Sequence, residues 1–320
     1  MKSSARPFLD QLIDYAGLFP PAKLSLEDAL RIYLHERKTS AHRWMLGRFV
    51  CPTARLQELS TLARSHEDAS FLSVTALGRP APDLSEFFAN LETDLMAIES
   101  FRRGWGTDSV VDTIEVPLPK GGDVDAFVYW LGYAAKHMVQ AKLRGFLEIA
   151  RSAQWHDDTK KIAQGLGSLY DTWDQGLLGL KLRCGGLSAE AFPTNEQVAF
   201  FIARCNDAKI PWKATAGLHH PRRHWDQALQ LWHYGFLNVF GAGVLAWSNA
   251  LTEADLVEIL SDRDAQHFQF EPDRFAWKDW SCTAAQVILA RSAFAKSFGS
   301  CSFEEPCQDL VALGLLPTFG

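Results

Sequence analysis

Leu178-Gly179-Leu180-Lys181-Leu182-Arg183 and Pro211-Trp212-Lys213-Ala214-Thr215-Ala216-Gly217 are two short segments with a lysine inside each. Both predict β-strands, because their side chains alternate between an apolar and a polar face. The stretch between them, 194–207, predicts a helix that Thr194 caps at its N-terminus. A strand–helix–strand unit of this length is expected to be right-handed, with its two strands parallel.

The two strands of this unit carry cations on their inner faces. Alternation places Lys181 beside Arg183 on the first strand and Lys213 beside Thr215 on the second. A lysine on a strand that helices cover costs free energy unless it is paired or neutral. A neighbouring cation lowers the pKa of a lysine, and a neutral amine can attack a carbonyl to form a Schiff base. The alternative is that both amines lie in solvent or in salt bridges at the strand ends.

The rest of the chain repeats the alternation of strand-like and helix-like segments. The predicted strands are 12–16, 44–50, 71–77, 110–118, 144–150, 178–183, 211–217 and 236–240. Eight strands alternating with helices over about 230 residues favour a (β/α)8 TIM barrel over an open sheet. With no linker or repeat, we expect one domain over 1–320, with the barrel core at 8–246. The remainder, 247–320, is expected to be a C-terminal helical extension packed on the barrel, with helices at 252–260 and 283–296.

Composition excludes several classes of partner. The 320 residues are 47% apolar with a net charge of −6, which disfavours nucleic acids and anionic membranes as partners. No apolar run is long enough to span a membrane. The N-terminus does not have the apolar run of a secretory signal. The six cysteines lack zinc-type spacing, so we expect free thiols in a cytoplasmic protein.

Acidic residues accompany the lysines on the inner faces of other strands. Alternation directs Asp14, Glu115 and Glu148 towards the interior. Together with Lys181, Arg183 and Lys213, they place three acidic and three basic side chains from five strands close to one another. Charges placed late in barrel strands indicate a site at the C-terminal face of the barrel. The alternative is a salt-bridged plug without chemistry.

These strands resemble those of class I aldolases of the 2-deoxyribose-5-phosphate aldolase type. The residues that carry the resemblance are Ile13-Asp14-Tyr15, Val50-Cys51-Pro52, Ile114-Glu115-Val116, Leu147-Glu148-Ile149, Leu180-Lys181-Leu182-Arg183-Cys184-Gly185, Trp212-Lys213-Ala214-Thr215-Ala216-Gly217 and Phe240-Gly241-Ala242. The resemblance implies a lyase that needs no cofactor or metal and forms a lysine Schiff base with a small carbonyl substrate. The chain departs from the family at Arg183-Cys184, which replace small hydroxylated residues, and at Glu115, which replaces an aspartate.

The resemblance also implies roles for individual residues. The expected catalytic residues are Lys181 as nucleophile, Lys213 to lower its pKa, Glu115 and Asp14 to move protons, and Glu148 to orient a lysine. The expected substrate-binding residues follow the strands: Arg183, Gly185, Gly186, Thr215, Gly217, His219, His220 and Gly241. Arg183 or the histidines are suited to an acidic group on the substrate. The sequence leaves a homo-oligomer open.

Two other functions compete with the aldolase hypothesis. His219 and His220 follow the second lysine strand, where a loop faces the active-site mouth of a barrel. With Glu148 they would suit a metal-dependent lyase or hydrolase. The third hypothesis is a barrel without catalytic activity.

Overall fold

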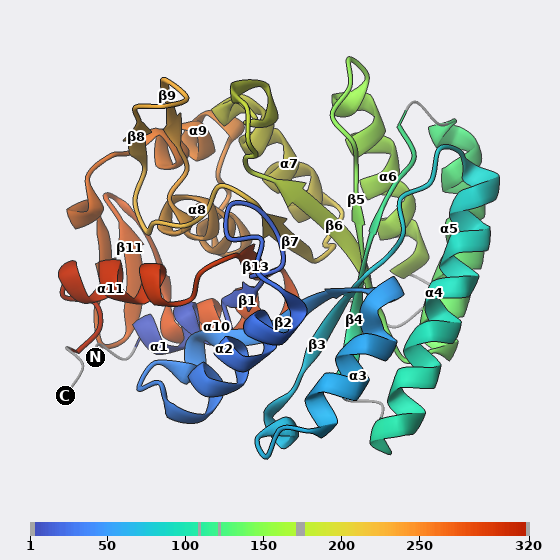
Figure 1. The fold of residues 1–320 in the computed structure, drawn as a ribbon. Coiled ribbons are helices and arrows are strands. Elements are labelled where there is room, and N and C mark those ends of the chain that lie inside the picture. Colours follow the sequence, from blue (N-terminus) through green and yellow to red (C-terminus); the bar gives the residue numbers. More distant parts are fainter. Residues whose placement is uncertain (1–3, 108–109, 121–122, 171–176, 318–320) are drawn as a thin grey trace.

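The computed structural model describes residues 4–107, 110–120, 123–170 and 177–317. Within these residues, eight parallel strands close a barrel in the order β1-β13-β7-β6-β5-β4-β3-β2 (Figure 1). The strands are β1 (Ile13–Tyr15), β2 (Leu46–Pro52), β3 (Val74–Leu77), β4 (Val111–Pro117), β5 (Arg144–Glu148), β6 (Leu178–Arg183), β7 (Trp212–Thr215) and β13 (Ala295–Ser300). The predicted (β/α)8 barrel is confirmed.

Helices join consecutive strands and surround the barrel (Figure 1). They are α2 (Leu26–Thr39), α3 (Leu56–Arg64), α4 (Leu84–Trp105), α5 (Val124–Gln140), α6 (Trp155–Tyr170) and α7 (Asn195–Asp207). Short polar side chains cap several of these helices, because the first backbone N–H groups of a helix need acceptors. Thr194, the predicted N-cap of α7, forms a complete capping box with Gln197.

The connection from β7 to β13 contains most of the remaining elements. In chain order they are β8 (His224–Asp226), β9 (Leu231–His233), α8 (Phe236–Ser248), α9 (Glu253–Ser261), β10 (Phe268–Phe270), β11 (Arg274–Trp277), β12 (Trp280–Thr283) and α10 (Ala284–Ala293). Strands β8 and β9 form a hairpin, and β10–β12 form an antiparallel sheet. Helix α1 (Ala5–Leu9) precedes the barrel, and α11 (Glu304–Ala312) follows it.

The prediction of the eighth strand at 236–240 is wrong. That segment begins α8, in which every residue from Phe236 to Ala246 is buried. A uniformly apolar run does not distinguish a buried strand from a helix that is buried on all sides. The eighth strand is β13, which pairs with β7 and β1. The barrel therefore extends to Ser300, so the expected boundary between a core at 8–246 and an extension at 247–320 is also wrong.

The N-terminal segment packs against the long β7–β13 connection. Phe8 of α1 lies with its ring centroid 5.2 Å from that of Phe270 and 4.9 Å from that of Phe275. The buried guanidinium of Arg291 in α10 donates hydrogen bonds to the carbonyls of Phe8 and Asp10. Since these residues immediately precede β1, the packing lies at the N-terminal ends of the barrel strands. The C-terminal face is thus left to the loops that carry the candidate site.

Two further expectations concern the membrane and the cysteines. In the ranges that the structure describes, no helix is both long enough and apolar enough to cross a bilayer. The six cysteines are free thiols, as the sequence predicts, and five of them are buried.

One hydrophobic core runs through the described chain, from Ala5 to Leu316. Because α1 and the β7–β13 connection share that core with the barrel, we expect a single cooperative unfolding transition. Denaturant titration followed by far-ultraviolet circular dichroism and by tryptophan fluorescence should give coincident curves. Two transitions separated along the denaturant axis would contradict the single domain.

Candidate active site

Five charged side chains from five strands meet inside the barrel. The Lys181 amine lies 2.8 Å from Glu115 Oε2 and 2.9 Å from Glu148 Oε2. The Lys213 amine lies 2.7 Å from Asp14 Oδ2 and 2.5 Å from Glu115 Oε1. Glu115 therefore bridges the two lysines. The structure brings together five of the six charged residues that the sequence placed in the interior, whereas the sixth, Arg183, is largely exposed at the end of its strand and pairs with Glu148.

Strand register explains how these residues meet. Glu148, Lys181 and Lys213 are in register across β5, β6 and β7. In-register residues of adjacent parallel strands point to the same side of a sheet, here the barrel interior. Glu115 on β4 is in register with Phe146 of β5 and reaches both lysines across the interior. The predicted alternation of inward and outward residues is therefore confirmed on these strands.

Asp14 is fully buried and held by three donors. It accepts hydrogen bonds from the backbone N–H of Arg48 at 2.7 Å and from the Ser297 hydroxyl at 2.8 Å, besides its ion pair with Lys213. Gly47 makes room for this carboxylate, because a Cβ at that position would lie 2.4 Å from Asp14 Oδ1. Asp14 is therefore fixed in place and orients Lys213.

The carboxylates around Lys181 raise its pKa, whereas the sequence led us to expect a lowered pKa. Burial alone favours a neutral Lys181, but the charges of Glu115 and Glu148 outweigh burial and hold its pKa above the usual range. The expectation that Lys213 and Arg183 lower this pKa is wrong, because Glu115 lies between the two lysines and Glu148 between Lys181 and Arg183. Burial likewise opposes ionisation of Glu115, yet the two lysines lower its pKa to about 2. Lys181, Glu115 and Glu148 are therefore ionised at neutral pH.

A cavity of about 590 Å³ opens beside the cluster at the C-terminal ends of the strands. Glu148 and Arg183 belong to its wall, and the Arg183 Nε donates a hydrogen bond to Glu148 Oε1 at 3.0 Å. The other lining residues are Pro80, Ala81, Pro82, Pro117, Leu118, Lys120, Ile149, Ala150, Arg151, Glu190 and Ala191. Glu148 thus lies between the buried Lys181 amine and the cavity.

Close backbone approach explains the glycines after β6 and β7. Gly217 has a φ of +70°, and a Cβ there would lie 3.0 Å from the Cα of Gly185. A Cβ on Gly186 would lie 2.6 Å from that of Ala191. Thr215 is in register with Arg183 and Gly299 at the ends of β6 and β13. These four predicted substrate-binding positions lie at the C-terminal face, where the sequence placed them.

Gly241 lies elsewhere. It is in the middle of α8, and a Cβ there would lie 3.2 Å from the ring of Phe268 and 3.3 Å from that of Phe275. Its expected place at the end of an eighth barrel strand is wrong, because the segment is a helix. Gly241 serves the packing of α8 against the β10–β12 sheet.

The histidine loop contacts the C-terminal segment instead of the charged cluster. His219 Nδ1 lies 3.2 Å from Glu305, and His220 Nδ1 lies 2.6 Å from Asp309. Glu148 bonds to Lys181 and Arg183, so the proposed metal-ligand set of Glu148, His219 and His220 does not converge. Within the described ranges, no three His, Cys, Asp or Glu side chains are grouped as metal ligands would be. The loop and α11 together form one side of the barrel mouth.

Three contributors to the site escaped sequence reasoning. The sequence predicts a helix to 296 and no strand after it, so it gives no sign of the inward hydroxyl of Ser297. Lys120 and Arg151 line the cavity just after β4 and β5. Both residues come immediately after predicted strands, and side chains at such positions face the mouth of a barrel. Their positions in the sequence therefore indicate that they lie near the site.

Comparison with known proteins gives a distant likeness among solved structures. No family model matches the chain, and no curated protein matches its sequence. Among solved structures, the chain is similar to a deoxyribose phosphate aldolase from Aeropyrum pernix, which is described as a unique tetramer. The identity is 12% and the TM-score 0.41, over 97% of this chain and 98% of the other.

Proposed function

We propose that the protein is a lyase of the aldolase type that forms a Schiff base between Lys181 and a small carbonyl substrate. The observation that carries the proposal is the position of the Lys181 amine between two carboxylates, one of which, Glu148, lines a cavity. A lysine nucleophile needs a base to take its proton and an acid to release water from the carbinolamine. Glu115 and Glu148 are both at hydrogen-bonding distance for these transfers.

Lys181 is better placed than Lys213 to act as the nucleophile. Its partner Glu148 lines the cavity, so the Lys181 amine lies 2.9 Å from a carboxylate oxygen of a cavity-lining residue. The partners of Lys213 are Glu115 and the fully buried Asp14, and neither lines the cavity. Lys213 therefore holds Glu115 in its ionised form and takes no part in bond formation.

The reaction can be written with residues of this chain alone. Lys181 passes a proton to Glu148 and adds to the substrate carbonyl, and water then leaves with a proton returned by the carboxylic acid. The resulting iminium withdraws the electrons of the bond between the α- and β-carbons. This bond breaks as a carboxylate removes the proton of the β-hydroxyl group. An aldehyde departs, and the enamine that remains takes up a proton and is hydrolysed to the second carbonyl product.

Substrates with an acidic group fit the cavity best. Lys120, Arg151 and Arg183 line it, against the acidic Glu148 and Glu190, and Glu148 is already paired with Lys181 and Arg183. Arginine suits a carboxylate or phosphate because its planar fork can bind two oxygens. Arg183→Leu is expected to raise the KM for an acidic substrate and to leave the KM for a neutral analogue nearly unchanged.

The rival function is a barrel without catalytic activity, and the ionised state of Lys181 favours it. A retro-aldol assay separates the two hypotheses. With a panel of β-hydroxy ketones and β-hydroxy keto acids, we expect cleavage that speeds up as pH rises above 7. The reason is that the resting amine is protonated, and attack requires the neutral form. No cleavage of any panel member at any pH from 6 to about 10 would favour the inert barrel.

A chelator distinguishes the lysine mechanism from metal-dependent cleavage. Treatment with EDTA, followed by gel filtration, is expected to leave the rate of cleavage unchanged. His219→Ala should change the rate less than tenfold, because its imidazole bonds to Glu305 at the edge of the mouth. Loss of activity together with stoichiometric zinc or manganese would contradict the lysine mechanism.

A further inference from the structure

The cavity beside the charged cluster, of about 590 Å³, is lined by side chains of only two kinds. One kind is charged: Lys120, Glu148, Arg151, Arg183 and Glu190. The other kind is apolar and consists of proline, alanine, leucine and isoleucine. Among the described residues that line the cavity, none has a hydroxyl, amide or imidazole side chain. A bound molecule therefore meets either a charge or a hydrocarbon surface.

The apolar residues lie at the ends of three neighbouring strands. Segment 80–82 follows β3, segment 117–118 lies at the end of β4, and segment 149–150 follows β5. These strands are adjacent in the barrel, and the backbone N–H of Leu118 donates a hydrogen bond to the carbonyl of Glu148 at 2.9 Å. The three segments therefore form one side of the cavity, which we call the apolar wall.

Buried hydrogen bonds hold the first segment of the apolar wall in place. Asp94 of α4 is fully buried, and its carboxylate accepts hydrogen bonds from the Thr53 hydroxyl and from the backbone N–H of Arg79. The same carboxylate pairs with the Arg79 guanidinium. The Asn90 side chain, also on α4, donates a hydrogen bond to the carbonyl of Pro80 at 3.2 Å. Because the wall is already fixed, little conformational entropy is lost when a ligand packs against it.

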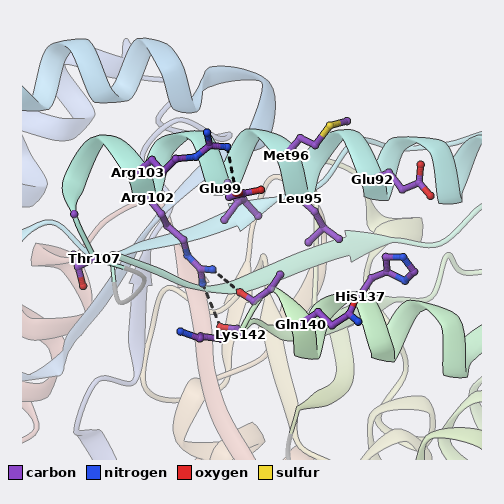
Figure 2. A pocket seen from close by; sticks show the side chains of 13 residues that line it. Glu92, Leu95, Met96, Glu99, Arg102, Arg103, Thr107, His137, Gln140 and Lys142 are labelled. Carbon is purple, nitrogen blue, oxygen red and sulfur yellow. Dashed lines mark hydrogen bonds and ion pairs between the residues drawn. The ribbon is translucent and has the colours of Figure 1, made fainter.

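A larger hollow, of about 1000 Å³, lies outside the barrel between α4 and α5 (Figure 2). Arg102 lines this hollow and donates hydrogen bonds to the carbonyls of Val111 and Lys142, near the N-terminal ends of β4 and β5. The cavity with the apolar wall lies at the opposite, C-terminal ends of the same strands. The hollow is therefore a separate site, and Met96, which is 62% exposed in its wall, provides a comparison position.

We propose that the cavity takes a substrate with an acidic group at one end and a hydrocarbon chain beyond the reacting carbons at the other. This names the substrate class of the proposed lyase and, for the reaction itself, rests on that function. The cations of the cavity bind the acidic group. The hydrocarbon chain lies against the apolar wall, where each buried CH2 group raises the affinity by about fourfold.

A polyhydroxylated chain does not suit the apolar wall. Each hydroxyl group loses its hydrogen bonds to water on burial, and this costs free energy unless a protein group replaces them. The side chains of the wall offer no donor or acceptor, and Pro80, Pro82 and Pro117 also lack a backbone N–H. A sugar-like substrate is therefore expected to bind less tightly than an aliphatic one of equal length.

Binding of inert carboxylates tests the substrate class without catalysis. The aliphatic probes are acetate, butanoate, hexanoate and octanoate, which have no aldehyde or ketone group and cannot form an imine. Gluconate is the matched probe, because it has the carbon chain of hexanoate with a hydroxyl on every carbon beyond the carboxylate. Ligand-observed NMR titration of the full chain gives the dissociation constants. We expect the affinity to rise about threefold with each added CH2 group, and hexanoate to bind about tenfold or more tightly than gluconate.

Substitutions locate the hydrocarbon chain. Ile149→Thr replaces an ethyl group of the apolar wall by a hydroxyl and is expected to weaken hexanoate binding about fivefold, with acetate binding nearly unchanged. Ala81→Ser is a smaller change in the same wall and should weaken hexanoate binding about twofold. Ile288→Thr makes the matched exchange on the exposed surface of α10, and Met96→Thr changes the hollow of Figure 2. Both should bind hexanoate like the parent. Circular dichroism and thermal melting establish that each variant is folded.

Equal affinity for hexanoate and gluconate, or no gain from butanoate to octanoate, would overturn the proposal. So would a loss of hexanoate binding in Met96→Thr with none in Ile149→Thr and Ala81→Ser, because the probe would then lie in the hollow between α4 and α5. Failure of the proposed lyase is seen separately, as the absence of a trapped imine. That absence together with the expected dissociation constants would contradict the lyase and still support the ligand class.

Discussion

Glu115→Ala is expected to lower the free energy of unfolding by about 3–5 kcal/mol. The carboxylate is buried and binds Lys181 and Lys213 at once, so its removal leaves two cations facing each other in the interior. Urea denaturation at pH 7 measures the change. The matched control is Glu99→Ala, which removes an exposed carboxylate from a surface ion pair and should cost less than about 1 kcal/mol. Equal effects of the two substitutions would contradict the buried bridge.

The Glu115 carboxylate should also make the free energy of unfolding depend on pH in the acidic range. Glu115 has a pKa of about 2 in the folded state against 4.5 for a free glutamate, so the folded form binds protons less readily. Its contribution, about 3 kcal/mol, is present above pH 4.5 and is lost as pH falls towards 2. In the isosteric Glu115→Gln variant this loss should be absent, which urea midpoints at pH 7 and pH 3 would detect. A parent and variant with parallel pH dependence would contradict the pKa shift.

Lys181→Arg is expected to lower the rate of substrate cleavage by about 10³-fold or more, while the variant keeps its fold. Arginine keeps the positive charge between Glu115 and Glu148, but its guanidinium stays protonated and cannot form an imine. Lys213→Arg is the matched variant, since it keeps the charge beside Asp14 and should leave slower but measurable turnover. Steady-state kinetics on one cleaved substrate compares the two. Similar losses in both variants would mean that the lysines do not have the separate roles proposed.

Alternation along single strands was sufficient to predict the inward residues of the site. Glu148 on β5 and Lys181 on β6 point inward because their neighbours in sequence pack outward against helices. What alternation could not show is contact across the barrel. Glu115 on β4 reaches Lys181 on β6 past the intervening strand β5, and together with Glu148 it raises the pKa of Lys181, which the neighbouring cations led us to expect to be lowered.

The eighth strand was missed for a different physical reason. β13 carries Ala295, Ser297, Gly299 and Ser300, small or polar residues that give no apolar strand pattern. Its place in the barrel depends on long-range pairing with β1, at the other end of the chain, and on the bond from Ser297 to Asp14. The apolar run at 236–240 resembles a buried strand more closely than β13 does, but it belongs to a helix that is buried on all sides.

Borohydride reduction in the presence of a carbonyl donor tests the Schiff base most directly. The protein is incubated with each of a panel of aldehydes, ketones and keto acids, reduced, digested and mapped by mass spectrometry. The expected result is the mass of the reduced donor on the peptide that contains Lys181, with no adduct in Lys181→Arg and a slower one in Lys213→Arg. An adduct on Lys213 would reverse the roles of the two lysines, and the absence of an adduct with every donor would contradict Schiff-base catalysis.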